Sequence, residues 1–419
     1  MVDPSAAGVL SGALLLGAAG LQAMWSLGRR QQRDLLQEQR ERGRRDEFGI
    51  QLDQALRWAR ARHPRLRAWT GTRPLRVAEV VEESADARSF YLAPEDGRDL
   101  PPFESGQYLT FHLPAADPAA PIIRCYSLSD RPRDDYYRVT IRRVPPPAGE
   151  PQAPWGRAST YFHHAVRPGT VLHAEAPQGA FFLDPTDGLP VVLAGAGIGV
   201  TPLVSMAASL VHARDPREVR FFAGFRNSDQ RPLAGELAQL AAASSRLGLD
   251  VSFSQPLATD LQGRDYDHRG HVDVDRLRRV LPSNNYRFYL CGPPAMLQDL
   301  APALRRWGVP REHIHYEAFG PATVRGLSEE QGAGAACRVD LARSGRSLAW
   351  HGNSGSLLEL AEAAGLRWDA GCRAGNCGSC RLRVLAGRVR HRRAPGAELA
   401  AGECLACIAV PDGDAVIDA

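Results

Sequence analysis

The chain has 419 residues, which is enough for two or three domains. Its formal net charge of +4 is too small to indicate nucleic acid as a partner. Lysine is absent and the 51 basic residues are arginines, a bias to which we attach no function. Five of the eight cysteines lie in the last 50 residues, and thiols at that density favour a reducing compartment.

The chain begins with an uncharged run of 20 residues, 8–27, which three arginines follow closely. A helix of about 20 apolar residues can just cross a bilayer, and flanking arginines stay on the cytoplasmic side. We therefore expect residues 1–28 to form a transmembrane anchor that holds the rest of the chain in the cytoplasm. Four glycines and Gln22 weaken this pattern, so a disordered tail or a wrongly assigned start stays open.

Residues 29–72 are rich in charge, and their apolar residues are sparse. This pattern predicts a helical spacer in solvent, interrupted at Gly43. Its arginines would suit the anionic headgroups of a membrane, and a plain solvated face is an equal alternative.

From residue 73 to 186 the sequence consists of short alternating runs, with proline and aspartate between them. Such runs predict the strands of an antiparallel β-barrel, one of which ends in Arg142. A guanidinium suits a phosphate, an aromatic ring suits a flat heterocycle, and a helix start offers N–H groups to a pyrophosphate. Two motifs provide these groups: Arg124-Cys-Tyr126-Ser127 on a strand, and Gly156-Arg-Ala-Ser159-Thr160 at a helix start.

Residues 187–320 alternate apolar strands with helices, which predicts an α/β domain with a parallel sheet. Glycines let a pyrophosphate approach the backbone, and a helix start receives it. A helix is expected from Leu203 to Ala213. The strand before it ends in Gly195-Ala-Gly197-Ile-Gly199-Val-Thr201, and a later strand ends in Cys291-Gly292-Pro293.

The choice between NADH and NADPH depends on the segment after the second strand of this domain. Arg226 and Arg231 could pair with the 2′-phosphate of NADPH, but Asp229 between them would repel it. The residues alone leave both nucleotides open.

Residues 337–419 contain Cys372, Cys377 and Cys380 at the spacing C-x4-C-x2-C. This is the plant-type spacing of a [2Fe–2S] cluster, which needs a fourth cysteine further along. Cys404 and Cys407 both qualify by position. The glycines of the loop let backbone N–H groups approach the sulfurs, which argues against the alternatives of a zinc site or disulfides.

Taken in register, these motifs resemble the ferredoxin–NAD(P) reductase superfamily fused to a C-terminal plant-type [2Fe–2S] ferredoxin domain. Reductases of oxygenases and of hybrid-cluster proteins share this order, and the flavin half also resembles flavohaemoglobin reductase domains. The implied fold is multidomain, with an N-terminal helical anchor. It then has an antiparallel β-barrel flavin domain (73–186), an α/β parallel-sheet NAD(P)-binding domain (187–320), a linker (321–336) and an α+β, β-grasp-like ferredoxin domain (337–419).

The resemblance also implies roles for single residues. Tyr126 and Ser127 would contact the isoalloxazine, and Cys291 would position the nicotinamide, so these three are the candidate catalytic residues. The resemblance selects Cys407 as the fourth cluster ligand beside Cys372, Cys377 and Cys380. The candidate cofactor-binding residues are Arg124, Tyr126, Ser127, Arg142, Gly156, Ser159, Thr160, Gly195, Gly197, Gly199, Thr201, Cys291, Gly292, Pro293 and Phe319.

The implied function is that of an NAD(P)H-dependent iron–sulfur flavoprotein reductase. Electrons would pass from NADH to FAD, then to the [2Fe–2S] cluster, and then to a separate protein. That acceptor would be an oxygenase, a membrane hydroxylase or desaturase, or a hybrid-cluster protein. The resemblance favours NADH over NADPH and FAD over FMN, with the second of each pair left open. Two other functions also stay open: a membrane-tethered redox sensor or electron carrier, and a terminal flavin reductase that acts directly on a small molecule.

Overall fold

The computed structural model describes residues 69–114, 122–146, 149–184, 187–317, 319, 336–352, 354–392, 395–397 and 399–419. The predicted anchor (1–28) lies outside these residues. So do the predicted spacer, apart from its last four residues, and the predicted linker, apart from residue 336. Among the described residues, no helix combines the length and the apolar character that a membrane crossing requires.

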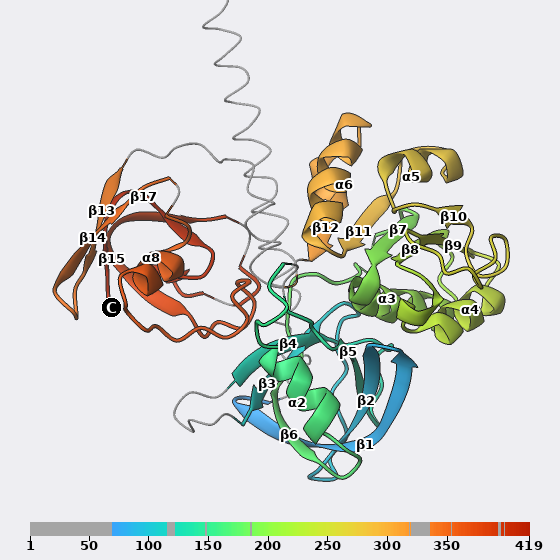
Figure 1. Ribbon diagram of the computed structural model, residues 1–419, viewed down its shortest axis with the longest axis horizontal. Helices are drawn as coiled ribbons and strands as arrows, with labels where there is room; N and C mark the ends of the chain where they lie inside the picture. Colours follow the sequence, from blue (N-terminus) through green and yellow to red (C-terminus); the bar gives the residue numbers. More distant parts are fainter. Residues whose placement is uncertain are drawn as a thin grey trace, which may run out of the picture. The chain divides into compact units, whose positions relative to one another are not determined.

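The described residues form three sheets, and the first of these is antiparallel and has six strands (Figure 1). Its strand order is β4-β3-β6-β1-β2-β5, and a bridge between Leu128 and Val139 draws its two edge strands together. Helix α2 (Arg157–Ala165) covers the core through Phe162, whose ring lies 5.1 Å from that of Phe90. The strands are β1 (Thr72–Ser84), β2 (Ala87–Pro94), β3 (Tyr108–Leu113), β4 (Ile122–Ser127), β5 (Tyr137–Arg142) and β6 (Val171–Glu175).

The second sheet is parallel, with the strand order β10-β9-β8-β7-β11-β12. Its continuous apolar strands are buried because helices cover both faces. Helices α3 (Val200–His212) and α4 (Ala234–Ala243) pack with one core cluster, and α5 (Val274–Val280) and α6 (Pro294–Arg306) pack with another. The strands are β7 (Val191–Ala196), β8 (Val219–Phe225), β9 (Leu247–Phe253), β10 (His268–Arg269), β11 (Arg287–Cys291) and β12 (Ile314–Glu317).

The order of the parallel strands reverses at β7, which lies between β8 and β11. Ligands of open α/β sheets bind beyond the carboxyl ends of the strands at such a reversal. Helix α3 begins there, at Val200, three residues earlier than predicted. Pro202 does not delay the helix, because N–H groups of the first turn have no helical partner.

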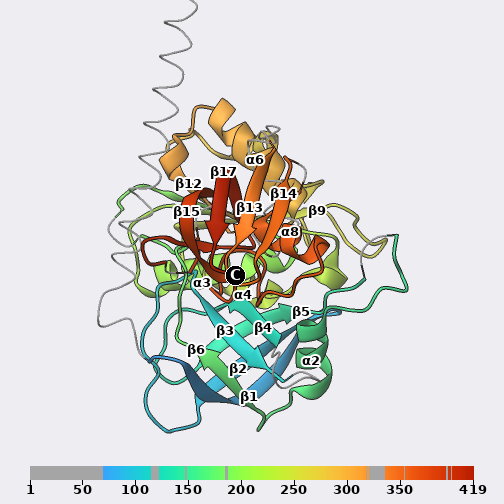
Figure 2. The same ribbon diagram turned by 90° about the vertical axis from the view of Figure 1, so that its left-hand side faces the viewer.

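The third sheet is mixed, with the order β14-β13-β17-β15-β16 and one parallel pair, β13 with β17 (Figure 2). Helix α8 (Leu357–Ala363) begins with a reciprocal cap between Ser356 and Glu359 and buries its leucines against the sheet. The strands are β13 (Cys337–Leu341), β14 (Arg346–Trp350), β15 (Arg381–His391), β16 (Glu403–Leu405) and β17 (Ala409–Ile417). The structure thus confirms a multidomain chain with an antiparallel, a parallel α/β and a C-terminal mixed sheet.

Candidate functional site

Strand β4 carries the predicted flavin residues Arg124, Tyr126 and Ser127. Ser127 is 6% exposed, and within the described part of the chain its Oγ has no hydrogen-bond partner. A buried hydroxyl without a partner costs about 1–3 kcal/mol, so this atom suits a polar ligand atom. The Tyr126 ring lies 5.2 Å from that of Phe162, and burial raises the pKa of its hydroxyl.

The start of helix α2 provides a second polar surface. Gly156 is its N-cap and has no side chain to occupy the first N–H groups, so they can receive an anion. Ser159 Oγ donates to the Gly156 carbonyl at 2.9 Å and accepts from the Val144 N–H at 3.0 Å, which holds the loop against the helix. The buried Thr160 Oγ1, in contrast, has no partner among the described residues. Two of the predicted flavin residues, Ser127 and Thr160, therefore offer unused buried hydroxyls.

The two arginines predicted for the flavin site differ from each other in their surroundings. Arg142 is exposed at the end of β5. Arg124 Nη1 donates to the Ile123 carbonyl at 2.7 Å and to the Gly371 carbonyl at 2.5 Å. Its contact with residue 371 of the cysteine loop was not predicted from the sequence, because it joins residues 247 positions apart.

The predicted glycine turn lies at the carboxyl end of β7, against the turn that follows β11. A Cβ on Gly199 would lie 2.6 Å from the Cys291 carbonyl carbon and 2.7 Å from the Gly292 nitrogen. A Cβ on Gly195 would lie 2.7 Å from Leu203 Cδ1. Gly197 has a φ of +55° and open space before it. The sheet thus brings together Gly195, Gly197, Gly199, Cys291, Gly292 and Pro293, as a dinucleotide site requires.

Thr201 and Cys291 are buried in this arrangement. The Thr201 hydroxyl donates to the Ile198 carbonyl at 2.9 Å, so in this structure it shapes the turn. Cys291 is 0% exposed at the end of β11, which suits positioning through its backbone and not attack by its thiol. Phe319 is 38% exposed, after β12. The roles of these residues toward a nucleotide or flavin stay predictions.

The basic residues after β8 are held by the protein itself. Arg226 is exposed and Nε donates to Gln255 Oε1 at 2.8 Å. Arg231 Nη1 donates to the Asp265 carbonyl at 2.9 Å, and burial lowers the pKa of this guanidinium. Arg226 is therefore the better exposed of the two for a 2′-phosphate.

The predicted cluster cysteines fall into two pairs. The Cys372 N–H donates to Cys377 Sγ at 3.2 Å, and the neighbouring Cys407 lowers the pKa of the Cys380 thiol. Backbone N–H groups point at these sulfurs: Asn376 N lies 3.2 Å and Cys377 N 3.3 Å from Cys372 Sγ. Among the described residues, no three His, Cys, Asp or Glu side chains surround one point as a single metal ion needs. Two sulfur pairs with N–H donors fit a two-iron cluster.

The rival fourth ligand, Cys404, is fully buried on β16 within the apolar core, where burial raises the pKa of its thiol to about 12. Gly375 shapes the loop beside Cys407: its φ is +75°, and a Cβ there would lie 3.1 Å from Ile408 Cγ1. These contacts favour Cys407, and the choice of ligand stays a prediction.

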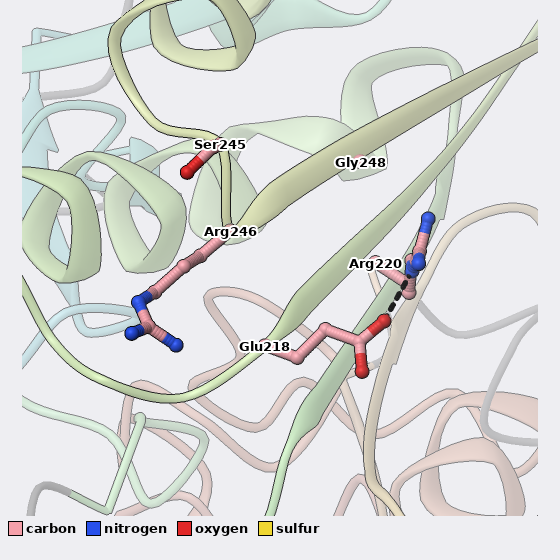
Figure 3. A pocket seen from close by; sticks show the side chains of 5 residues that line it. All are labelled: Glu218, Arg220, Ser245, Arg246 and Gly248. Atoms are coloured by element: carbon pink, nitrogen blue, oxygen red, sulfur yellow. Dashed lines mark hydrogen bonds and ion pairs between the residues drawn. The ribbon is translucent and has the colours of Figure 1, made fainter.

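A polar cavity of about 340 Å³ lies elsewhere in the parallel domain (Figure 3). It is beside the amino ends of β8 and β9, and within its lining Arg220 Nε donates to Glu218 Oε1 at 2.6 Å. The amino ends are the opposite edge of the sheet from the glycine turn, so this cavity is separate from the predicted dinucleotide site. It is lined by Glu218, Arg220, Ser245, Arg246 and Gly248.

Comparison with known families assigns two of the three parts. The family described as oxidoreductase NAD-binding domain matches residues 193–301, and the 2Fe-2S iron-sulfur cluster binding domain matches residues 339–412. The fold and the site thus define an oxidoreductase with a pyridine-nucleotide domain and an iron–sulfur domain in one chain. The chain thus combines an oxidoreductase NAD-binding domain with a C-terminal 2Fe–2S domain.

Among curated proteins, the chain is similar to flavohemoproteins. That of Rhodopirellula baltica is 39% identical over 255 residues, which cover 60% of this chain and 62% of that protein. That of Chromobacterium violaceum is 37% identical over 252 residues, which cover 60% of this chain and 61% of that protein. The chain therefore spans less than two thirds of the length of these relatives.

Among solved structures, the chain is similar to the flavohem-like FAD/NAD binding domain of nitric oxide dioxygenase from Vibrio cholerae. The two chains are 31% identical with a TM-score of 0.53, and the match covers 60% of this chain and 100% of that chain. A cytochrome P450 reductase from Amycolatopsis has a TM-score of 0.50 and 28% identity, with 60% of this chain and 71% of that chain covered. Phthalate dioxygenase reductase shares the fold across 83% of this chain and 98% of its own, with a TM-score of 0.51 and 24% identity.

These comparisons confirm the predicted family and the prediction of an NAD(P)H oxidoreductase. They also confirm an NAD-type nucleotide and a [2Fe–2S] cluster among the predicted cofactors.

Proposed function

We propose that the protein carries electrons from NADH through FAD and a [2Fe–2S] cluster to a separate acceptor protein. Strand β4 is the observation that carries this proposal. It presents the unpartnered Ser127 hydroxyl, and three residues earlier Arg124 is hydrogen-bonded to the cysteine loop. One strand therefore contacts both the predicted flavin site and the predicted cluster site.

Bound FAD would supply the conversion of a two-electron hydride transfer into one-electron steps. The protein supplies positioning. The glycine turn after β7 would bind the nucleotide pyrophosphate at the start of α3, and the turn at Cys291 would orient the nicotinamide. Ser127 Oγ would donate to the flavin N5, and the start of α2 together with Thr160 would bind the flavin pyrophosphate.

The proposal also covers the folds of the flavin and ferredoxin domains and the choice of NADH and FAD as cofactors. The bridge between Leu128 and Val139 supports a barrel for the flavin domain, and the mixed sheet with α8 supports a β-grasp-like ferredoxin domain. Arg231 already donates a hydrogen bond to the Asp265 carbonyl, which supports NADH over NADPH. The start of α2 and the unpartnered Thr160 hydroxyl support FAD, whose pyrophosphate needs more donors than the single phosphate of FMN.

The acceptor follows from the relatives. The Amycolatopsis structure is a cytochrome P450 reductase, which supports an oxygenase as the acceptor of this protein. The curated relatives are flavohemoproteins, and this supports a haem protein as a second candidate acceptor. Membrane hydroxylases, desaturases and hybrid-cluster proteins stay in the proposal, and the predicted anchor (1–28) would favour a membrane-bound acceptor.

The test is an anaerobic titration of the full chain with NADH and, separately, NADPH, followed by visible absorbance. We expect flavin bands and a broad cluster shoulder, both bleached at lower concentrations of NADH than of NADPH. Cytochrome c reduction should be lost in Cys372→Ala, whereas reduction of ferricyanide by the flavin should persist. Cluster absorbance that ignores both nucleotides would support a sensor or carrier. Cytochrome c reduction that does not need Cys372 would support a terminal flavin reductase.

A further inference from the structure

Arg138 on β5 forms a largely buried ion pair with Glu236 on α4, and so joins the antiparallel sheet to a helix of the parallel domain. Arg138 is 6% exposed, and its Nη1 lies 2.5 Å from Glu236 Oε2. The predicted site includes neither residue, and the proposed function gives them no role. Because removal of one partner would leave the other charge buried and uncompensated, the pair holds the two elements together.

The same guanidinium holds the segment that follows the predicted flavin strand. Arg138 Nε donates to Ser129 Oγ at 3.1 Å, and Nη2 donates to the Ser129 carbonyl. In return, the Ser129 N–H donates to the Arg138 carbonyl at 2.8 Å. Ser129 is 0% exposed and lies two residues after Ser127, whose hydroxyl is the proposed donor to the flavin N5. Arg138 therefore connects α4 with the end of β4.

A second polar path joins the same two parts. The N–H of Leu233, the N-cap of α4, donates to Glu83 Oε2 on β1 at 3.2 Å. Ser89 Oγ donates to Glu83 Oε1 at 2.5 Å and contacts Thr140 Oγ1 at 2.8 Å. Thr140 Oγ1 in turn lies 2.8 Å from Ser129 Oγ. The two paths leave α4 three residues apart and meet at Ser129, so they form a closed ring of polar contacts.

The charged ends of the ring fix the direction of its hydrogen bonds. An ionised carboxylate only accepts, so the single proton of Ser89 goes to Glu83. Thr140 must then donate to Ser89, and Ser129 must donate to Thr140. Ser129 Oγ is left to accept from Arg138 Nε, as observed. Every hydroxyl of the ring is thus used, which makes the ring a rigid connection.

Helix α3, which begins at the predicted pyrophosphate turn, reaches the same segment. Ser205 on α3 is 0% exposed, and its hydroxyl donates to the carbonyl of Asp130, the residue after Ser129, at 2.6 Å. The segment after β4 is therefore held from two helices of the parallel domain, α3 and α4. A nicotinamide oriented by that domain and a flavin contacted by Ser127 would keep a fixed separation.

We propose that Arg138 and Glu236 are positioning residues for hydride transfer, and that their ion pair sets the position of Ser127, and with it the flavin N5, relative to the nicotinamide. Neither residue belongs to the glycine turn or to the predicted flavin motifs. Loss of the pair should therefore slow the reaction within the complex and leave the binding of NADH unchanged. This inference rests on the proposed function.

The test compares full-length Glu236→Ala, Glu236→Gln and Arg138→Lys by stopped-flow reduction of bound flavin over a range of NADH concentrations. We expect Glu236→Ala to lower the limiting rate about 10- to 100-fold, since a misplacement of about 1 Å costs about 100-fold, with an unchanged dissociation constant for NADH. Glu236→Gln keeps an oxygen that accepts from Arg138 and should lose less of the rate. Arg138→Lys keeps the charge but loses the planar fork that reaches Ser129, and should stay slow.

The matched control is Asp250→Ala, which breaks the ion pair of Asp250 with Arg276 inside the parallel domain and should keep the wild-type limiting rate. Hydrogen–deuterium exchange of the loaded chain without NADH is a second readout. Exchange in residues 127–130 should rise in Glu236→Ala, although the substitution lies on α4, and should not change in Asp250→Ala.

A wild-type limiting rate in Glu236→Ala overturns the inference, and so does an effect confined to the dissociation constant for NADH. A slow rate without faster exchange in residues 127–130 also overturns it, because the effect would then not pass through the end of β4. If Glu236→Ala does not hold flavin, the same two measurements on Glu236→Gln decide. Bound flavin that NADH does not reduce in the wild-type chain is a different result, because it contradicts the proposed function itself.

Discussion

Gly199 offers a direct test of how the two turns of the nucleotide site are placed. Its φ is −65°, a value that alanine adopts without strain, so Gly199→Ala changes only the space between the turns. The new methyl group would lie 2.6 Å from the Cys291 carbonyl carbon and closer still to its oxygen. No flexible side chain can yield there, since the opposing atoms are backbone.

The size of the effect follows from these distances. Ordinary van der Waals contact begins at 3.4 Å, so one turn must move by about 1 Å from the other to clear the Cys291 carbonyl oxygen. Overpacking of this kind destabilises a protein by about 1–3 kcal/mol. A displacement of about 1 Å in a reacting geometry slows a reaction about 100-fold, which is about 2.7 kcal/mol. We therefore expect flavin reduction by NADH to slow about 100-fold in Gly199→Ala.

The measurement is stopped-flow reduction of the flavin by NADH, together with thermal melting and the visible spectrum. Flavin and cluster absorbance should be retained, because the change lies in the parallel domain. The matched control is Gly235→Ala on α4, where a methyl group meets nothing within 4 Å, and it should reduce flavin at the wild-type rate. A wild-type rate in Gly199→Ala as well would show that the Cys291 turn does not position the nicotinamide.

Three further changes probe other parts of the site. Ser127→Ala should slow flavin reduction about 5- to 150-fold, since a hydrogen bond of about 1–3 kcal/mol is lost, and normal stopped-flow kinetics would refute its role at N5. Cys407→Ala should abolish the cluster shoulder and Cys404→Ala should retain it; the reverse result would exchange their roles. His391 accepts a backbone N–H at 3.0 Å, and burial lowers its pKa to about 4. This pKa is below the value of about 6.5 in the unfolded chain, so neutral His391 stabilises the folded state fully above about pH 6.5. The contribution, at most about 3 kcal/mol, is lost as the pH falls toward 4. Melting curves of His391→Gln should therefore depend less on pH than those of the wild type or of the exposed control His351→Gln, and an identical pH dependence would contradict this.

Motifs made of neighbouring residues were predictable because their chemistry depends on spacing along the chain. The C-x4-C-x2-C run indicated the cluster, and the glycine turn after β7 indicated the dinucleotide site; comparison with known families confirmed both kinds of domain. Patterns of period two and continuous apolar runs likewise predicted an antiparallel and a parallel sheet, since burial on one or two faces imposes these patterns. The anchor predicted for residues 1–28 lies outside the described residues.

The sequence by itself therefore determined the kinds of domain and their order, which depend on short-range patterns. Only the tertiary structure decided which groups are already engaged and which remain available. In the structure the Thr201 hydroxyl donates to the Ile198 carbonyl of its own turn, and Arg231 donates to the Asp265 carbonyl. The Ser127 hydroxyl has no partner in the described chain. The structure also brings Arg124 to the Gly371 carbonyl, 247 positions away in the sequence. Such contacts are set by how separate sheets pack, and no local pattern of residues records that packing.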